Sequence, residues 1–285
     1  MIENLNMLVC GGAPVSGNAN RDPLVRPAGG PRGDTIEVGS THTNGLDRPL
    51  ISVHFPKASG SSFRVALEAA FGKAVRLDSA CDPVDPANPM WVNPDWFLRH
   101  RPRDVEPFTV VHGHLPIVKY DLLPSAYRVV MLREPVENLI SIYYFWQHLI
   151  SIGQGGHALF EHVKNQRLSL LEVAEIPRMR RLMSSSYFGG YDMRRFDVVG
   201  THDNRTAFVE AVSHLIGVPL SADIRVNVTS PSQERENVLA DAKLIAKLRN
   251  LLQDDIRFYE ACATLSNGVR DDSSTASDDW APPPG

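Results

Sequence analysis

The stretch "LISVHFPKASGSSFRVALEAAFG", residues 50–72, joins a strand pattern to a helix pattern through a short polar loop. The apolar run 50–55 predicts a buried strand. Residues 61–71 place Phe63, Leu67 and Phe71 on one helix face, with Gly72 as C-cap. The loop between them carries a lysine, a glycine and three serines. Because backbone amides at a helix N-terminus bind anions, the junction predicts a phosphate-binding loop.

The order of residues in this loop differs from that of the nucleotide-binding Walker A motif. Lys57 precedes Gly60, whereas a Walker A motif places its lysine directly after a glycine. The chain also shows no strand that ends in an aspartate able to hold magnesium, which disfavours an ATPase or kinase. The alternative is that Ser61 or Ser62 only caps the helix, and the loop alone leaves both interpretations open.

The rest of the folded region alternates strands with helices. Further buried strands are expected at 108–113, 127–134 and 196–201, and helices at 135–150, 169–175, 204–217 and 236–263. The proline-rich segment 80–107 predicts a long loop with one short helix. This alternation predicts an α/β, P-loop-like three-layer fold with a central parallel sheet and helices on both faces. Ligands of such sheets bind at the carboxyl ends of the strands.

Composition indicates the bounds of the folded domain and the partners that are unexpected. Residues 1–48 predict a disordered N-terminal segment, 49–264 one folded domain, and 265–285 a disordered acidic tail. A net charge of −4 makes a nucleic-acid partner unexpected. The three cysteines form no CxxC pair, so no disulfide framework or zinc site is expected, and a reducing compartment fits. We expect neither a signal peptide nor a transmembrane segment.

A second motif, "VHGHLP" at 111–116, follows a buried strand. It brings His112 and His114 to the ligand edge of the sheet, and strand alternation points both side chains to one side. Imidazole is the natural general base near neutral pH. A metal pair is the alternative, although no third ligand of suitable spacing is present, and a purely structural role stays open.

A third motif, "VVMLREPVENLISIYYFW" at 129–146, places Arg133 at a strand end and Ser141 eight residues later in a helix. An arginine can bind a phosphate through two parallel hydrogen bonds, and the serine hydroxyl can add another. The alternatives are a salt-bridged arginine and a serine that faces its own helix backbone.

In this order and at this spacing, the three motifs resemble those of the carbohydrate sulfotransferases that use 3′-phosphoadenosine 5′-phosphosulfate (PAPS). The chain looks most similar to the group that contains heparan sulfate 2-O-sulfotransferase, over about residues 50–263. That family's loop reads approximately H-I-P-K-T-G-G-T-S. Lys57, Gly60 and Ser62 match it, Ser61 replaces a threonine, and Ala58 and Ser59 depart from threonine and glycine.

The resemblance implies a site and a reaction. It assigns His114 as catalytic base, Lys57 as the group that stabilises the leaving group, and Arg133 with Ser141 as the 3′-phosphate site. The loop residues Ala58, Ser59, Gly60, Ser61 and Ser62 would hold the 5′-phosphate, and Thr229 would add a cofactor contact. Candidate substrate contacts are His112, Arg178 and Arg180. No metal is expected.

The implied enzyme transfers the sulfuryl group of PAPS to a hydroxyl of a glycan or glycolipid and releases adenosine 3′,5′-bisphosphate. The animal relatives are membrane-anchored, whereas this chain shows no anchor, so a soluble, cytoplasmic, bacterial enzyme is expected. The alternatives that stay open are a P-loop-type nucleotide kinase or NTPase, a catalytically silent nucleotide-binding protein, and a metal-dependent hydrolase. The sequence predicts no oligomeric state.

Overall fold

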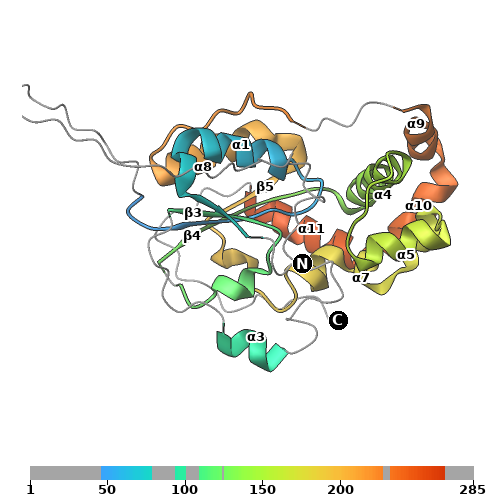
Figure 1. Ribbon diagram of the computed structural model, residues 1–285, viewed down its shortest axis with the longest axis horizontal. Coiled ribbons are helices and arrows are strands. Elements are labelled where there is room, and N and C mark those ends of the chain that lie inside the picture. Colours follow the sequence, from blue (N-terminus) through green and yellow to red (C-terminus); the bar gives the residue numbers. More distant parts are fainter. Residues whose placement is uncertain (1–45, 79–93, 101–108, 124, 227–231, 267–285) are drawn as a thin grey trace, which may run out of the picture.

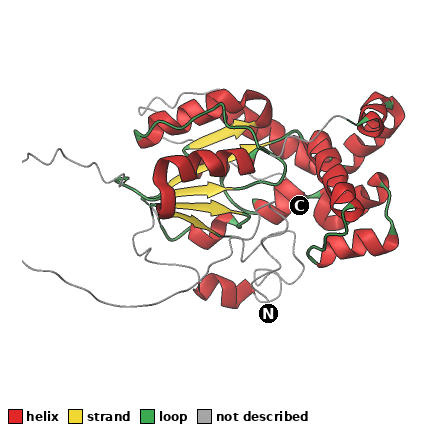
Figure 2. Ribbon diagram, turned by 45° about the horizontal axis from the view of Figure 1, so that its top comes forward, coloured by secondary structure: helices red, strands yellow, loops and turns green. Residues whose placement is uncertain are grey.

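The computed structural model describes residues 46–78, 94–100, 109–123, 125–226 and 232–266. Among these residues, five strands form one parallel sheet in the order β2-β3-β1-β4-β5, so β1 is central (Figure 2). The strands are β1 (Leu50–Val53), β2 (Val75–Leu77), β3 (Val110–Gly113), β4 (Tyr127–Leu132) and β5 (Val198–Thr201). The predicted parallel α/β fold is confirmed.

Helices cover both faces of the sheet. On one face, α1 (Gly60–Phe71) and α8 (Arg205–Ile216) contribute Phe63 and Phe208 to a core that contains Leu50. On the other face, Ile51 packs in a larger core with residues of α4 (Pro135–Ser151), α11 (Gln253–Ser266) and the turn Leu182–Tyr187. Because successive strand residues point to opposite faces, a strand buried on both sides is largely apolar.

Most of the remaining helices gather beyond the carboxyl ends of the strands (Figure 1). They are α5 (Ala158–Gln166), α6 (Leu170–Glu175), α7 (Pro177–Arg180), α9 (Gln233–Ala240) and α10 (Ala242–Leu251), which adjoin α4. The helix α3 (Pro94–His100) lies apart from them. Single turns occupy Gly72–Ala74, Ile117–Tyr120, Met193–Arg195 and His202–Asn204. The site predicted at the strand ends is therefore enclosed between the sheet and these helices.

Local signals explain most element boundaries. Gly72 has a φ of 54° and its N–H donates to the Glu68 carbonyl, as predicted for a C-cap. Ser169 and Glu172 form the predicted capping box. The predicted helical stretch 236–263 is helical but begins at Gln233 and is divided into α9, α10 and α11. The first break occurs at Asp241, whose side chain accepts hydrogen bonds from the amides that open α10.

Several elements have no counterpart in the sequence prediction, among them α7 and the turn Leu182–Tyr187, and two of them are informative. β2 is a three-residue edge strand whose side chains are largely exposed, so it carries no buried apolar run. The second is α5, a nine-residue helix that His157 caps through its imidazole. The short helix expected within 80–107 is present as α3, while much of that segment lies outside the described residues.

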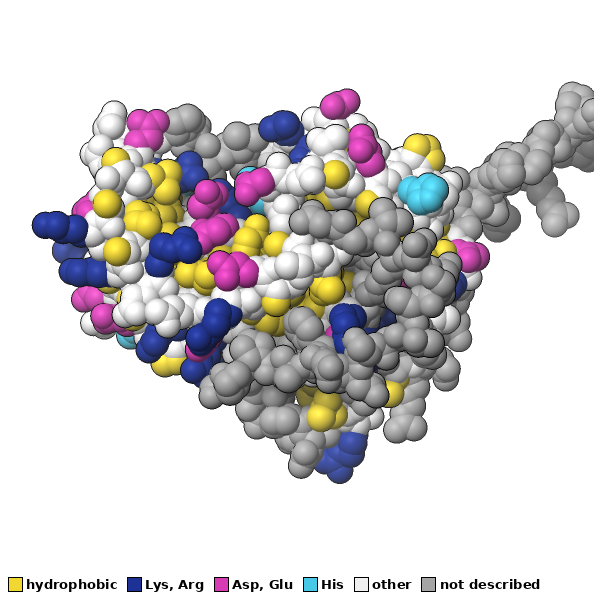
Figure 3. Space-filling view, turned by 180° about the vertical axis from the view of Figure 1, so that it is seen from behind, with side chains coloured by type: hydrophobic (Ala, Val, Ile, Leu, Met, Phe, Trp, Pro, Cys, Tyr) yellow, Lys and Arg dark blue, Asp and Glu magenta, His cyan; other side chains and the backbone are white. Residues whose placement is uncertain are grey.

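Several composition-based expectations fall largely outside the described residues. The predicted disordered segments 1–48 and 265–285 are described only at 46–48 and 265–266, and Cys10 and Cys81 are not described. Cys262 is a buried free thiol. Across the described part of the chain, every helix is too short or too polar to cross a membrane. Acidic and basic side chains are interspersed on the face shown in Figure 3.

Candidate functional site

The loop of residues 54–59 leaves the central strand β1 and enters α1, and two side chains near the start of α4 hold it in place. Arg133 Nη1 donates to the Lys57 carbonyl at 3.2 Å, and Asn138 Nδ2 donates to the Pro56 carbonyl at 2.7 Å. Both donors are buried. The predicted strand–loop–helix junction is thus present, and the region that contains Arg133 and Ser141 fixes its conformation.

The loop backbone is strained at two positions. Lys57 has a φ of 55° and Ser59 a φ of 64°, a left-handed conformation that residues with a Cβ rarely adopt. Ser59 occupies the N-cap of α1, yet its side chain makes no capping hydrogen bond. The alternative that Ser61 or Ser62 only caps the helix is wrong, because both residues lie inside α1 and Ser59 is at the N-cap. Backbone strain of this kind is concentrated at functional sites.

Gly60 has a packing reason that the sequence did not reveal. A Cβ built on Gly60 would lie 1.9 Å from Cδ2 of His54. In the structure, the absence of a side chain makes room for the His54 imidazole against the first turn of α1.

Three buried histidines, His54 at the start of the loop and His112 and His114 after β3 begins, pack against one another. The His54 ring stacks on His114, with centroids 4.2 Å apart, and on His112 at 5.0 Å. Burial, followed by the neighbouring imidazoles, holds the pKa of His54 well below its ordinary value and lowers the pKa of His112 to about 3. Both rings are therefore neutral at pH 7.

The two histidines of the "VHGHLP" motif have different partners. His112 Nδ1 lies 2.9 Å from the Ser52 hydroxyl, inside the sheet. His114 Nδ1 lies 3.0 Å from the hydroxyl of Tyr187, and both of these residues line the cavity described below. The structure thus separates a histidine held in the sheet from one placed at the ligand edge.

Lys57 carries an unusual ammonium group. Its Nζ lies 4.2 Å from the centroid of the Phe145 ring, a cation–π contact. Burial, and then the nearby charges of Arg133 and Arg235, lower the pKa of Lys57 to about 8. The lysine is therefore close to its titration point near neutral pH, where a bound anion would favour its charged form.

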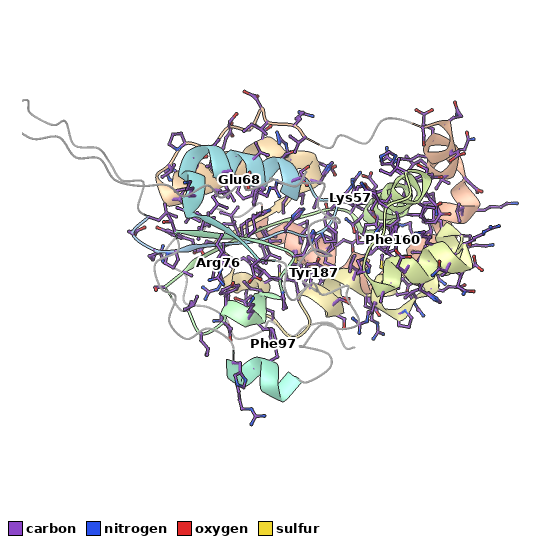
Figure 4. The ribbon with its side chains drawn as sticks, viewed as in Figure 1. Lys57, Glu68, Arg76, Phe97, Phe160 and Tyr187 are labelled. Atoms are coloured by element: carbon purple, nitrogen blue, oxygen red, sulfur yellow. The ribbon has the colours of Figure 1, made fainter. Side chains whose placement is uncertain are left out.

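A cavity of about 300 Å³ joins these groups at the carboxyl edge of the sheet. Figure 4 shows Lys57 and Tyr187 between the sheet and the α4–α5 helices. Five cationic side chains line it, and none of its described lining residues is Asp or Glu; the cations are Lys57, Arg133, Arg205, Arg225 and Arg235. The Nε atoms of Arg133 and Arg235 are buried with no hydrogen-bond partner among the described residues. Unpaired buried donors in a basic cavity fit an anionic ligand.

Most predicted cofactor residues lie in this cavity. Lys57, Ser59, Gly60, Ser61, Ser62, Arg133 and Ser141 line it, together with the predicted base His114. The Ser62 hydroxyl accepts a 3.0 Å hydrogen bond from the Val226 amide, so it also ties the segment before residue 227 to α1. Arg133 has the predicted salt bridge as well, to the half-exposed Glu137 at 3.4 Å.

Other predicted residues lie elsewhere. Ala58 and His112 are buried and do not line the cavity, and neither do Arg178 and Arg180 on α7. Arg180 Nε donates to the Leu251 carbonyl at 3.4 Å. Thr229 lies outside the described residues. In the described part of the chain, no three His, Cys, Asp or Glu side chains come together as a metal site requires.

Sequence reasoning missed several residues of the cavity. His54 and Tyr187 contact His114, while His202, Arg205 and Arg235 come from segments far along the chain. His54 stands within the quoted loop, and its place at a strand end was a usable signal. The other residues belong to no short motif, and only the folded structure brings them to the loop.

Comparisons with known proteins give a likeness in structure and none in sequence. No family model matches the chain, and no curated protein matches it in sequence. Among solved structures, it is similar to the crystal structure of a sulfotransferase from Alicyclobacillus acidocaldarius, with 17% identity and a TM-score of 0.31. That alignment covers 75% of this chain and 100% of the other. A likeness of this extent carries no conclusion about activity.

Proposed function

We propose that the protein is a sulfotransferase that moves the sulfuryl group of PAPS to a hydroxyl acceptor. One observation carries the proposal: a strained loop at the N-terminus of α1 opens into a cavity lined by five cations and no described acidic side chain. PAPS has anionic groups at both its 5′ and 3′ positions, so it fits a cavity with several separate cations. The three motifs that resemble the PAPS-dependent family converge on this cavity.

Different residues of the cavity would bind the 5′ end and the 3′-phosphate of PAPS. Lys57 and the amides at the start of α1 would hold the 5′ end, because a helix N-terminus combines unpaired N–H groups with a positive dipole. Arg133 and Ser141 would hold the 3′-phosphate, and the unpaired Nε of Arg133 leaves it a free donor among the described residues. Arg205, Arg225 and Arg235 supply further positive charge. The role of Thr229 stays a prediction.

His114 would act as general base. In the base-competent tautomer, Nδ1–H would donate to the Tyr187 oxygen, and the lone pair on Nε2 would take the acceptor's proton. When bound, PAPS would supply the sulfuryl group. A bond would form between its sulfur and the acceptor oxygen, and the bond between that sulfur and the bridging oxygen of the 5′-phosphate would break. Lys57 would stabilise the negative charge on that leaving oxygen. Catalysis of this kind rests on positioning and preorganised charge.

Transfer itself is the test of this function. The purified protein is incubated with ³⁵S-labelled PAPS and a panel of hydroxyl compounds in the presence of EDTA. We expect label in an acceptor with the wild-type protein and its loss in His114→Ala. Transfer from γ-³²P-labelled ATP that requires added magnesium would favour the nucleotide kinase instead.

A further inference from the structure

We propose that the acceptor is an uncharged hydroxyl compound with an apolar body, such as a ring system or hydrocarbon, and not a sugar. This inference rests on the proposed sulfotransferase function and names the substrate class of the same cavity. It revises the glycan acceptor that the sequence resemblance implies, and it comes from the walls of the cavity.

One wall of the cavity is apolar. Ile142, Phe145 and Trp146 lie on one face of α4 at positions i, i+3 and i+4, and all three line the cavity. Met179 of α7 and Leu182 of the following turn also line it, and both side chains are almost fully buried. A cavity that combines an apolar wall with a few convergent polar groups is typical of small-molecule sites.

This wall adjoins the proposed reacting groups. Phe145 contacts the Lys57 ammonium at 4.2 Å. Leu182 begins the turn that ends at Tyr187, whose hydroxyl lies 3.0 Å from His114. A compound that packs against the wall is therefore held beside both the proposed base and the lysine, and its hydroxyl has His114 as a partner.

The polar side chains of the described lining are cations, imidazoles, hydroxyls and the Trp146 indole. It contains no Asp, Glu, Asn or Gln side chain, so it offers no carboxylate or amide oxygen to accept hydrogen bonds from sugar hydroxyls. The lining cations are better matched to the anionic groups of the cofactor, and the apolar wall offers sugar hydroxyls little. A ring or hydrocarbon needs no such partners and gains from the burial of its apolar surface.

Five arginines on α7 and the turns after it do not line the cavity. They are Arg178, Arg180, Arg181, Arg194 and Arg195. Arg181 pairs with Asp254 at 2.9 Å, Arg194 with Asp192 at 2.9 Å, and Arg195 with Asp121. These charges are thus engaged on helices and turns, and they form no basic extension of the cavity for an acidic glycan.

The test measures acceptor binding separately from cofactor binding. The protein is first titrated with adenosine 3′,5′-bisphosphate, and the saturated complex is then titrated with 2-naphthol and with cellobiose. We expect 2-naphthol to bind and cellobiose not to bind. Met179→Gln introduces an amide of similar size into the wall, and we expect it to weaken 2-naphthol binding about tenfold while bisphosphate affinity stays within twofold. Met183→Gln is the matched control, because Met183 is equally buried but does not line the cavity.

Each other result would overturn the inference. Cellobiose binding, or the absence of 2-naphthol binding by the bisphosphate complex, would reject an apolar acceptor. Loss of bisphosphate affinity in Met179→Gln would assign the wall to the adenine ring, and equal losses of 2-naphthol affinity in Met179→Gln and Met183→Gln would reject a specific wall. If Met179→Gln does not fold, Leu182→Asn takes its place. Failure of the wild-type protein to bind the bisphosphate would instead reject the proposed function itself.

Discussion

The Nδ1 atom of His114 lies 3.0 Å from the hydroxyl oxygen of Tyr187, and both side chains are buried at the cavity edge. The two residues are 73 positions apart, so the contact exists only in the folded chain. It restrains the orientation of the imidazole and, in the tautomer that the proposed mechanism requires, puts the lone pair on Nε2. This arrangement makes Tyr187 a positioning residue for the proposed base.

Removing the Tyr187 hydroxyl tests this positioning role. We expect Tyr187→Phe to lower kcat roughly threefold to tenfold, because one hydrogen bond is lost while the ring packing against Phe55 is kept. The pH dependence of kcat should shift as well, with bisphosphate affinity unchanged. A variant with wild-type kcat and an unaltered pH profile would contradict the role.

Loss of the proposed base should have a larger effect. We expect His114→Ala to lower kcat by roughly 10²–10⁴-fold, the usual contribution of a general base, while calorimetry shows intact bisphosphate binding. The exposed His148 on α4, which does not line the cavity, provides the control variant His148→Ala. Wild-type turnover by His114→Ala would reject the assignment.

The pKa of Lys57 near 8 predicts a pH dependence of anion binding. An anion favours the protonated lysine, so affinity is fully present below pH 8 and falls as pH rises through it, about tenfold between pH 7 and pH 9. Calorimetry of bisphosphate binding in buffers of different ionisation enthalpy should show proton uptake near pH 8. Lys57→Arg stays charged over this range and should give a flat profile, and a sloping profile in that variant would point to another group.

The strained loop predicts opposite effects for two neighbouring substitutions. Ser59→Gly should raise the free energy of unfolding by up to about 1 kcal/mol, because glycine tolerates the left-handed φ of 64° but is freer in the unfolded chain. Gly60→Ala should lower it by roughly 1–3 kcal/mol, because the new methyl group meets His54. Urea denaturation measures both values. A destabilised Ser59→Gly variant would show that the serine side chain matters more than the strain.

The sequence predicted four of the five described strands because they are largely apolar and buried, and it predicted several helices from their caps. It also placed the loop after β1, Arg133 and His114 at strand ends, where they line one cavity, because each belongs to a short motif, while their roles stay predictions. β2 was missed because its side chains are largely exposed, so burial leaves no pattern in them. Prediction from sequence thus succeeds where local pattern and buried structure coincide.

The rest of the cavity could not be predicted, because it is assembled from distant segments. Tyr187, Arg205 and Arg235 come from the turn Leu182–Tyr187, from α8 and from α9, and they line the cavity only in the folded chain. The reason for Gly60 was also hidden, since it depends on how the His54 ring folds back onto α1. Long-range packing decides these positions, and no short spacing in the sequence encodes it.

Calorimetric titration with adenosine 3′,5′-bisphosphate in the absence of magnesium, beside ADP and ATP, tests the central claim most directly. We expect the bisphosphate to bind more tightly than ADP, and Arg133→Ala to weaken its binding about 10- to 100-fold through loss of a charge-assisted hydrogen bond. Arg257→Ala, at an exposed position outside the cavity, should leave Kd unchanged. No binding of the bisphosphate, or a preference for ATP with magnesium, would contradict the sulfotransferase assignment.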